Sequence, residues 1–233
     1  MPENNAEPAL YLIATPIGNL GDVTLRAIQL LGSVDRLYAE DTRHSQRLLQ
    51  AIGVDRQALP CHEHNEQAVA SDITRAIQNG LSCGLISDAG TPGISDPGFR
   101  VVRACTAAGL KVIPVPGPNA AVAALSASGL PTDQFLFMGF LPPRRAARLR
   151  VFEAHIEQSA TLVFYESTHR IDKFLEDAES IFGPERIICL ARELTKRHET
   201  LLTGTILEVR QALGKGSSKG EFVVLIAKSG YTL

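Results

Sequence analysis

The first half of the chain repeats one pattern, in which a short apolar run is followed at once by a loop of turn-forming or polar residues. The apolar runs lie at 9–14, 36–39, 84–86 and 111–115, and their loops at 15–22, 40–45, 87–98 and 116–119. Short continuous apolar runs are typical of strands buried on both faces of a sheet. Segments with helical signals separate them: at 25–31, where Thr24 is the expected cap, and at 46–52, 65–79 and 99–108. This alternation predicts a mostly parallel sheet covered by helices.

The pattern changes after residue 118. Helices are expected at 119–128, 169–182 and 206–213, and strands at 135–140, 161–165, 186–191, 199–203 and 221–227. A length of 233 residues permits one large domain or two of about 110 residues. The economical interpretation is an α/β protein with two domains, an N-terminal α/β domain at 1–118 and a C-terminal α/β domain at 119–233.

Composition excludes several classes of protein. The formal net charge of −2 predicts no particular partner, and the four cysteines have no CxxC or metal-ligand spacing, which favours reduced thiols. His62 and His64 lack a further ligand at useful spacing, so no metal site is expected. No apolar run approaches the length of a membrane span, and residues 1–8 lack the basic flank of a signal peptide. We therefore expect a cytoplasmic protein with no membrane association.

The loop at 87–98 is the strongest candidate for a ligand site. It contains three Gly, two Pro and two Asp between an apolar run and a predicted helix. Such a loop can present backbone N–H groups to a small molecule at the carboxyl end of a strand. The alternative is a tight strand-to-helix connection with Asx turns and an N-cap. The dinucleotide fingerprint and the P-loop are both missing, so the small-residue character favours a cofactor such as S-adenosylmethionine over a polyphosphate.

Six motifs, in this order, resemble those of the tetrapyrrole methylase family. They are the segments 14–20 (ATPIGNL), 39–43 (AEDTR), 87–98 (SDAGTPGISDPG), 114–120 (PVPGPNA), 164–167 (FYES) and 190–196 (LARELTK). The resemblance covers about residues 9–227, and within the family it is to the branch that methylates small-subunit ribosomal RNA. It implies two α/β domains with S-adenosylmethionine in the cleft between them, and a homodimer.

For this branch the resemblance also implies 2′-O-methylation of a cytidine ribose in the decoding region of 16S rRNA, in the small ribosomal subunit. Carried over by motif, the cofactor-binding residues are Pro16, Asp88, Gly90, Thr91, Pro92, Ala120, Ala121 and Ser167. Methylases of porphyrin precursors have a more Gly-rich first loop than the Thr-Pro-Ile-Gly-Asn found here. This difference counts against a tetrapyrrole substrate.

A ribose 2′-hydroxyl is a weak nucleophile, so a positioned base is expected beside the aligned methyl donor. The candidate catalytic residues are Asp41, Lys196 and Glu193, with Glu40 and His44 as further candidates. Lys196 would serve if burial or nearby arginines lowered its pKa. The alternatives are a local ion pair and helix cap at 40–43, and a solvated charged surface at 192–197. The sequence does not choose the base.

RNA binding requires a cationic surface, because phosphates dominate affinity. The candidate RNA-binding residues are Arg43, Arg144, Arg145, Arg148, Arg192 and Arg197. A solvated helix face is the alternative for the cluster at 144–150. Two other functions stay open: a porphyrin- or corrin-precursor C-methyltransferase of the same fold, and a non-catalytic S-adenosylmethionine-responsive RNA-binding protein.

Overall fold

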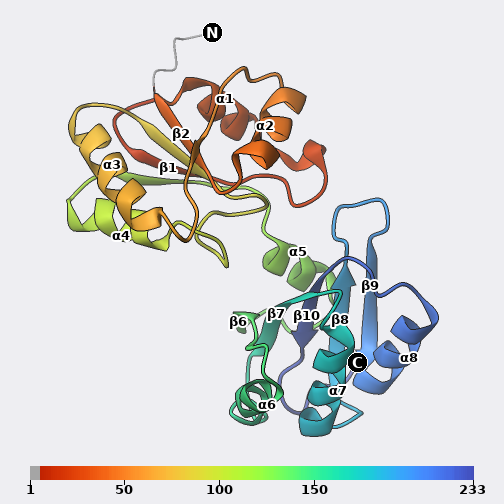
Figure 1. Cartoon of the computed structure of the whole chain (residues 1–233). Helices are drawn as coiled ribbons and strands as arrows, with labels where there is room; N and C mark the ends of the chain where they lie inside the picture. The colour runs from red at the N-terminus through yellow and green to blue at the C-terminus, as the bar shows by residue number, and fades with distance from the viewer. Residues whose placement is uncertain (1–5) are drawn as a thin grey trace. The chain divides into compact units, whose positions relative to one another are not determined.

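The computed structural model describes residues 6–233 and has the predicted α/β class (Figure 1). The chain divides into two compact units, the first ending at Asn119 and the second spanning Ala120–Leu233. Among the described residues, every helix is too short or too polar to cross a bilayer.

The first unit is built on a five-stranded parallel sheet with the order β3-β2-β4-β1-β5. Its strands are β1 (Leu10–Ile13), β2 (Arg36–Ala39), β3 (Leu59–Pro60), β4 (Cys83–Ile86) and β5 (Val112–Val115). Its helices are α1 (Leu25–Ser33), α2 (Thr42–Ala51), α3 (Glu66–Gln78) and α4 (Phe99–Ala107), with a 3-10 turn at Leu20–Asp22. The predicted mostly parallel sheet is therefore present.

Helices cover both faces of this sheet (Figure 1). Alternate residues of β1 point to opposite faces, so Tyr11 and Ile13 pack with α1 and α2, whereas Leu10 packs with α3 and α4. Both faces of the sheet are therefore buried from solvent, which explains why its strands are continuous apolar runs.

The N-termini of α1 and α2 are set by side-chain caps. The hydroxyl of Thr24 accepts a hydrogen bond from Ala27 N, which confirms the predicted cap of α1. Helix α2 begins at Thr42, earlier than the expected start at Gln46, because the Asp41 carboxylate accepts hydrogen bonds from the backbone N–H groups of Arg43 and His44. Because of this cap the helix begins about one turn earlier, and the polar residues 42–45 form its first turn.

The second unit has a mixed sheet with the order β6-β7-β10-β8-β9, in which only β6 and β7 are parallel. Its strands are β6 (Phe135–Phe140), β7 (Thr161–Ser167), β8 (Ile187–Arg192), β9 (Thr200–Thr205) and β10 (Glu221–Ile226). Its helices are α5 (Ala120–Ala127), α6 (Arg145–Glu153), α7 (Ile171–Phe182) and α8 (Ile206–Lys215).

Two apolar layers hold the second unit together. Small residues of α5, among them Ala121 and Ala124, pack on one face of the sheet, as the Ala-rich sequence of this helix suggests. On the other face, α6, α7 and α8 enclose edge-to-face aromatic rings, with Phe152 in contact with both Phe164 and Phe174. Edge-to-face rings gain energy beyond their buried area, so this layer is the rigid base of the unit.

Candidate functional site

The carboxyl ends of β1 and β4 form the topological switch point of the first sheet. The chain leaves β1 through α1 and crosses β4 to reach β2, and it leaves β4 through α4 and crosses β1 to reach β5. Helices α1 and α4 lie on opposite faces of the sheet, so the two connections leave the strand ends toward opposite faces. Open α/β sheets bind ligands at such a point, and here the loops 15–22 and 87–98 border it.

These two loops are joined by their backbones. Thr15 N donates to Gly90 O at 2.8 Å, and Gly90 N donates to Thr15 O at 3.0 Å. The buried hydroxyl of Thr15 donates to Ser87 O at 3.2 Å. The loop at 116–119 joins the same assembly, since Thr91 Oγ1 donates to Pro118 O at 3.2 Å.

Two glycines allow these loops to approach closely. Gly90 has φ +81°, and a Cβ there would lie 3.3 Å from the Ile17 side chain. A Cβ on Gly117 would lie 2.8 Å from the Cβ of Ala14, closer than carbon atoms tolerate. Both positions therefore require glycine, one for its conformation and the other for the close approach. The three loops are therefore packed closely against one another.

Five of the predicted cofactor-binding residues are in this assembly, namely Pro16, Asp88, Gly90, Thr91 and Pro92. The other three, Ala120, Ala121 and Ser167, belong to the second unit, where α5 begins and β7 ends. There Ala121 N donates to the phenol oxygen of Tyr165 at 3.2 Å. Sequence reasoning missed Tyr165, although it lies in one of the motifs.

The alternative explanation of the 87–98 loop, a tight strand-to-helix connection with Asx turns and an N-cap, included a cap for the helix that follows, and in the structure that cap comes from outside the loop. Gly98, at the N-terminus of α4, has no side chain to cap the helix. Instead the buried carboxylate of Glu66 in α3 accepts from Gly98 N at 2.9 Å and from Arg100 N at 2.8 Å. The carboxylates of Asp88 and Asp96 are therefore not used to start α4.

Carboxylates gather around the same loop, and their environments differ. Burial raises the pKa of Asp96 to about 6, and the nearby Asp88 adds to the effect. Burial also raises the pKa of Glu40, together with Asp96 and Asp88. In contrast, hydrogen bonds from the backbone of Arg43 and His44 lower the pKa of Asp41. Asp96 was not among the predicted candidates, and its only sequence signal is its place in the Gly-rich loop.

A second polar cluster lies in the other unit, where β8 ends and β10 begins. Lys196 Nζ lies 2.8 Å from Glu193 Oε1 and 2.8 Å from Glu221 Oε2. Glu193 and Thr195 have φ of 53° and 65°, a left-handed conformation that costs energy for residues with a Cβ. Backbone strain of this kind is concentrated at functional sites.

Lys196 was expected to act as a base if its pKa were lowered, but its pKa is shifted in the opposite direction. Burial alone lowers its pKa, but the hydrogen bonds to Glu193 and Glu221 outweigh that effect, and the pKa is raised. The lysine therefore holds its proton and offers a positive charge. Glu193, whose burial is offset by Lys196 and by the backbone of Glu221, has a lowered pKa.

The predicted RNA-binding arginines differ in their exposure and in whether another group of the chain binds them. Arg43, Arg144 and Arg197 are exposed. Arg145 is paired with Asp177 at 2.7 Å but is largely exposed, and Arg192 donates to Lys219 O and His198 O.

Arg148 requires a correction. It is 4% exposed, and its Nε donates to Asp177 Oδ2 at 2.8 Å, with a second hydrogen bond from its Nη2. It has no surface to offer a phosphate, so its role is structural.

A metal site has no support in the part of the chain that the structure describes. Across residues 6–233, no three His, Cys, Asp or Glu side chains come together in a way that could hold an ion.

Comparisons with known proteins agree on one family. The family model described as "Tetrapyrrole (Corrin/Porphyrin) Methylases" matches residues 9–210. A relative named "Ribosomal RNA small subunit methyltransferase I" from Pasteurella multocida (strain Pm70) is 49% identical over 96% of this chain and 80% of its own length. A relative of the same name from Escherichia coli O157:H7 is 44% identical over 96% of this chain and 79% of its own.

Solved structures show the same fold at low sequence identity. Uroporphyrin-III-C-methyltransferase from Thermus thermophilus has a TM-score of 0.62 at 22% identity, covering 95% of this chain and 94% of its own. The methyltransferase CobJ has a TM-score of 0.69 at 17% identity, covering 97% and 96%. These two likenesses concern the fold alone.

Proposed function

The chain belongs to the tetrapyrrole methylase family, and on that premise we propose that it methylates small-subunit ribosomal RNA with S-adenosylmethionine as the donor. The finer proposal is transfer to the 2′-hydroxyl of a cytidine ribose in the decoding region of 16S rRNA. The high identity, over nearly the whole chain, to relatives named for small-subunit ribosomal RNA supports the first proposal, and the six motifs that resemble this branch of the family support the finer one.

The loops at the switch point are a suitable place for this donor. The close packing at Gly90 and Gly117 holds the backbones of three loops together at the carboxyl ends of β1, β4 and β5, where open α/β sheets bind ligands. The carboxylates of Glu40, Asp88 and Asp96 supply negative charge beside these loops, which suits a sulfonium cation. We propose that Pro16, Asp88, Gly90, Thr91 and Pro92 bind the donor. The motif resemblance also implies donor contacts for Ala120, Ala121 and Ser167, and we propose these as well.

S-adenosylmethionine supplies an electrophilic methyl group bound to a positively charged sulfur. The protein's own task is to align the hydroxyl oxygen with that carbon and to remove the hydroxyl proton. A carboxylate with a raised pKa is a better proton acceptor than one held ionised by hydrogen bonds. On this ground Glu40 is favoured over Asp41 as the base, and Asp41 positions the turn that carries Glu40.

Lys196 and Glu193 then have a different task from proton removal. A lysine that keeps its proton between two carboxylates is a fixed cation, which can contact a phosphate or the developing charge on the ribose oxygen. Glu193 holds it in place. In this proposal Asp41 caps a helix, Lys196 supplies a fixed positive charge, and Glu193 holds Lys196 in place.

The test uses purified protein, S-adenosylmethionine labelled in its methyl group, and three acceptors offered separately. These are small ribosomal subunits from a strain lacking this protein, naked rRNA from that strain, and a porphyrin precursor. We expect label on the RNA, with resistance to alkaline cleavage at one position, because a 2′-O-methyl group blocks that reaction.

Label only on the porphyrin precursor would keep the fold and the donor but contradict the substrate. Binding of the donor with no label on any acceptor would favour a non-catalytic RNA-binding protein. Comparison of the two RNA acceptors shows whether the assembled subunit or free rRNA is methylated.

A further inference from the structure

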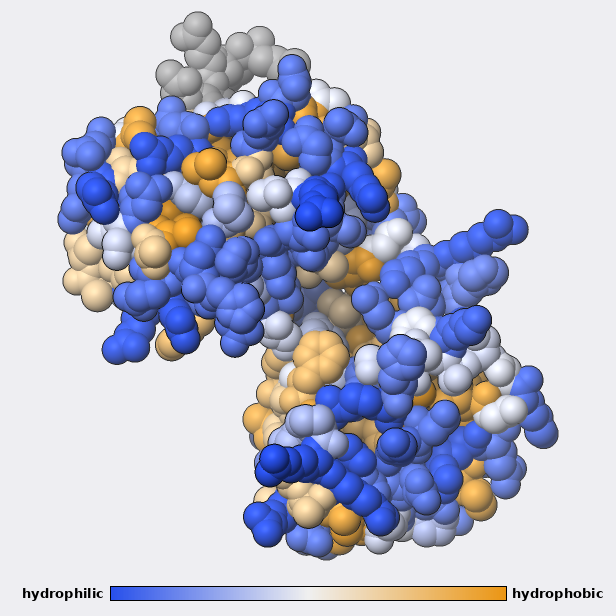
Figure 2. Space-filling model, in the orientation of Figure 1, coloured by the Kyte–Doolittle hydropathy of each residue, from blue (hydrophilic) through white to orange (hydrophobic). Residues whose placement is uncertain are grey.

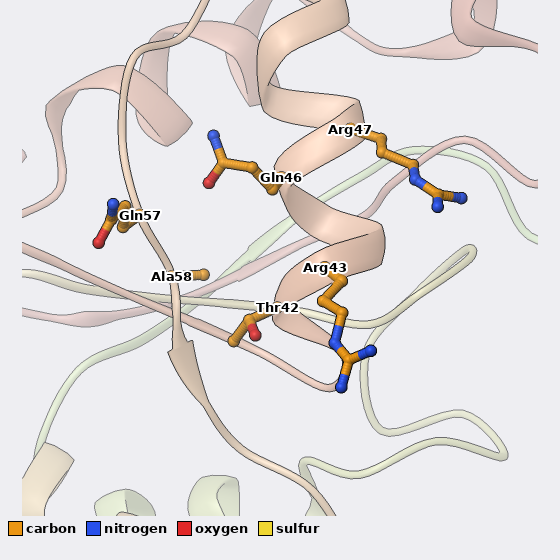
Figure 3. Close-up of a pocket in the computed structure, with 6 residues that line it drawn as sticks. All are labelled: Thr42, Arg43, Gln46, Arg47, Gln57 and Ala58. Carbon is orange, nitrogen blue, oxygen red and sulfur yellow. The ribbon is translucent and has the colours of Figure 1, made fainter.

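A polar groove lies along α2 in the first unit, and no predicted role accounts for most of it. It has a volume of about 410 Å³, and its lining residues are Thr42, Arg43, Gln46, Arg47, Gln57 and Ala58 (Figure 3). We propose that this α2 groove binds the sugar–phosphate backbone of a single-stranded RNA segment beside the methylated nucleotide. The proposal rests on the proposed function and names how its substrate is held.

The long side chains of the groove have nothing to bind within the chain. Among the described residues, Arg43, Arg47, Gln46 and Gln57 form no side-chain hydrogen bond or ion pair, and all four are at least partly exposed. Other exposed arginines, among them Arg75 and Arg103, have no such partner within residues 6–233 either; what distinguishes Arg43 and Arg47 is that both line one groove. Unengaged guanidinium groups that line a groove are free to bind an external anion.

The charge of the α2 groove is of one sign. Its lining includes two arginines and no acidic residue. Arg43 and Arg47 are four residues apart, so their Cα atoms are separated by about 6 Å along the helix axis. In Figure 3 both side chains extend from the side of α2 that faces away from the segment carrying Gln57 and Ala58. Each guanidinium can therefore bind a different phosphate of one strand. The Asp41 cap already occupies the first N–H groups of α2, so the side chains, not the helix end, are the donors.

The amides favour RNA as the occupant. Gln46 points from α2 into the space facing the segment that carries Gln57 and Ala58 (Figure 3). An amide both donates and accepts hydrogen bonds, as a ribose 2′-hydroxyl does. Recognition of that hydroxyl is how proteins distinguish RNA from DNA without reading bases.

The position of the α2 groove links it to the site of reaction within the same unit. Helix α2 follows directly on Glu40, and Asp41 N donates to Asp88 Oδ1 in the 87–98 loop at 3.1 Å. A strand held by Arg43 and Arg47 would therefore lie next to the loop that we propose holds the methyl donor. These arginines would bind the ground state and the transition state alike.

The test compares full-length native protein with an Arg43→Gln/Arg47→Gln variant, using a single-stranded oligoribonucleotide with the decoding-region sequence. A matched control, Arg75→Gln/Arg103→Gln, removes two exposed charges from α3 and α4 on the opposite face of the sheet. Binding is measured at several salt concentrations, and methyl transfer is measured on small subunits.

For the groove variant we expect the slope of log affinity against log salt to fall by about 1.4, because each phosphate that is no longer neutralised on a single strand lowers it by about 0.7. We expect its KM for the RNA acceptor to rise about tenfold with kcat unchanged, because uniform binding is weakened. Donor binding and the control variant should match the native protein. A Gln46→Ala/Gln57→Ala variant should lose preference for RNA over DNA of the same sequence.

Native affinity and salt slope in the Arg43→Gln/Arg47→Gln variant would overturn the inference while leaving the proposed function intact. Loss of binding to a polyglutamate peptide, with RNA binding unchanged, would also overturn it and assign the groove to an acidic protein segment. If native protein itself neither binds nor methylates RNA, the proposed function fails first, and the inference fails with it.

Discussion

Asp41 closes the first turn of α2 with its side chain, and the same carboxylate is a candidate base. We expect Asp41→Ala to lower Tm by about 2–4 °C, because the backbone N–H groups of Arg43 and His44 lose their acceptor. Asp41→Asn keeps an oxygen acceptor and should melt as the native protein does. Thermal unfolding by circular dichroism gives both values.

The Asn variant also separates the two roles of Asp41. Native stability with unchanged methyl transfer assigns the residue to the cap alone. Native stability with kcat about 100-fold lower would assign it to proton removal as well, and would contradict the preference for Glu40.

Asp96 makes stability depend on pH in a defined direction. Its pKa is about 6 in the folded protein, raised by burial, against an ordinary value of about 4 in the unfolded chain. The folded state therefore binds the proton more tightly, so its stabilising contribution is complete below about pH 4 and is lost as pH rises through 6. We expect the Tm of Asp96→Asn to exceed the native Tm increasingly from pH 4 to 7, by up to a few degrees.

The measurement is a melting curve at each pH without the donor. The control is Asp55→Asn, a change at an exposed carboxylate, whose Tm difference from the native protein should stay constant. A constant difference for Asp96→Asn too would contradict the raised pKa.

Residue types and spacing predict candidate site residues but not their surroundings. The Gly-rich loop, Asp88 and the motif containing Tyr165 are all visible in the sequence. The burial of Arg148 depends on Asp177, far along the chain, and the raised pKa of Lys196 depends on Glu221. Only the packing of separate elements decides such pairings.

At the scale of elements, the ion pair of Arg148 and Asp177 joins α6 to α7 inside the apolar layer. Both side chains are almost fully buried. We expect Asp177→Ala to destabilise the protein by about 3–5 kcal/mol, because it leaves a buried positive charge without a partner. Arg145→Ala removes the exposed partner of the same carboxylate and should destabilise the protein far less, because solvent screens that pair.

Urea unfolding at pH 7 measures both differences. Equal costs for Asp177→Ala and Arg145→Ala would show that the Arg148 pair is not shielded from water, contrary to its burial.

Short apolar runs and helical spacing predict most elements of both units. The sequence does not predict the mixed order of the second sheet, because strand pairing is set by tertiary packing that local pattern does not encode. Local pattern also places the start of α2 too late, because the polar residues 42–45 hide helical periodicity, whereas the Asp41 cap is what begins the helix.

At the scale of the whole molecule, the free edge of β6 bears on the expected homodimer. This strand ends the second sheet, and Phe135 and Phe140 are 46% and 56% exposed. Apolar residues also gather along the edge where β6 lies (Figure 2). Exposed edges with large apolar side chains are typical of interfaces, so we propose that two copies of the chain share this edge.

Light scattering should give twice the mass of one chain at micromolar concentration. Phe135→Ser/Phe140→Ser should give a monomer, whereas Leu25→Ser/Phe99→Ser, which changes two even more exposed apolar residues of the first unit, should remain a dimer. A native monomer would contradict the dimer, and a dimeric Phe variant would place the interface elsewhere.

The paired backbone bonds between Thr15 and Gly90 have a consequence for how this chain tolerates sequence change. The two loops lie far apart in the sequence, yet the N–H and C=O groups of each residue are paired with those of the other. An insertion or deletion between the end of β4 and Gly90 would move Gly90 away from Thr15 and break both bonds. We therefore expect the length of that segment to be fixed, whereas the pair does not constrain the length of either loop beyond it.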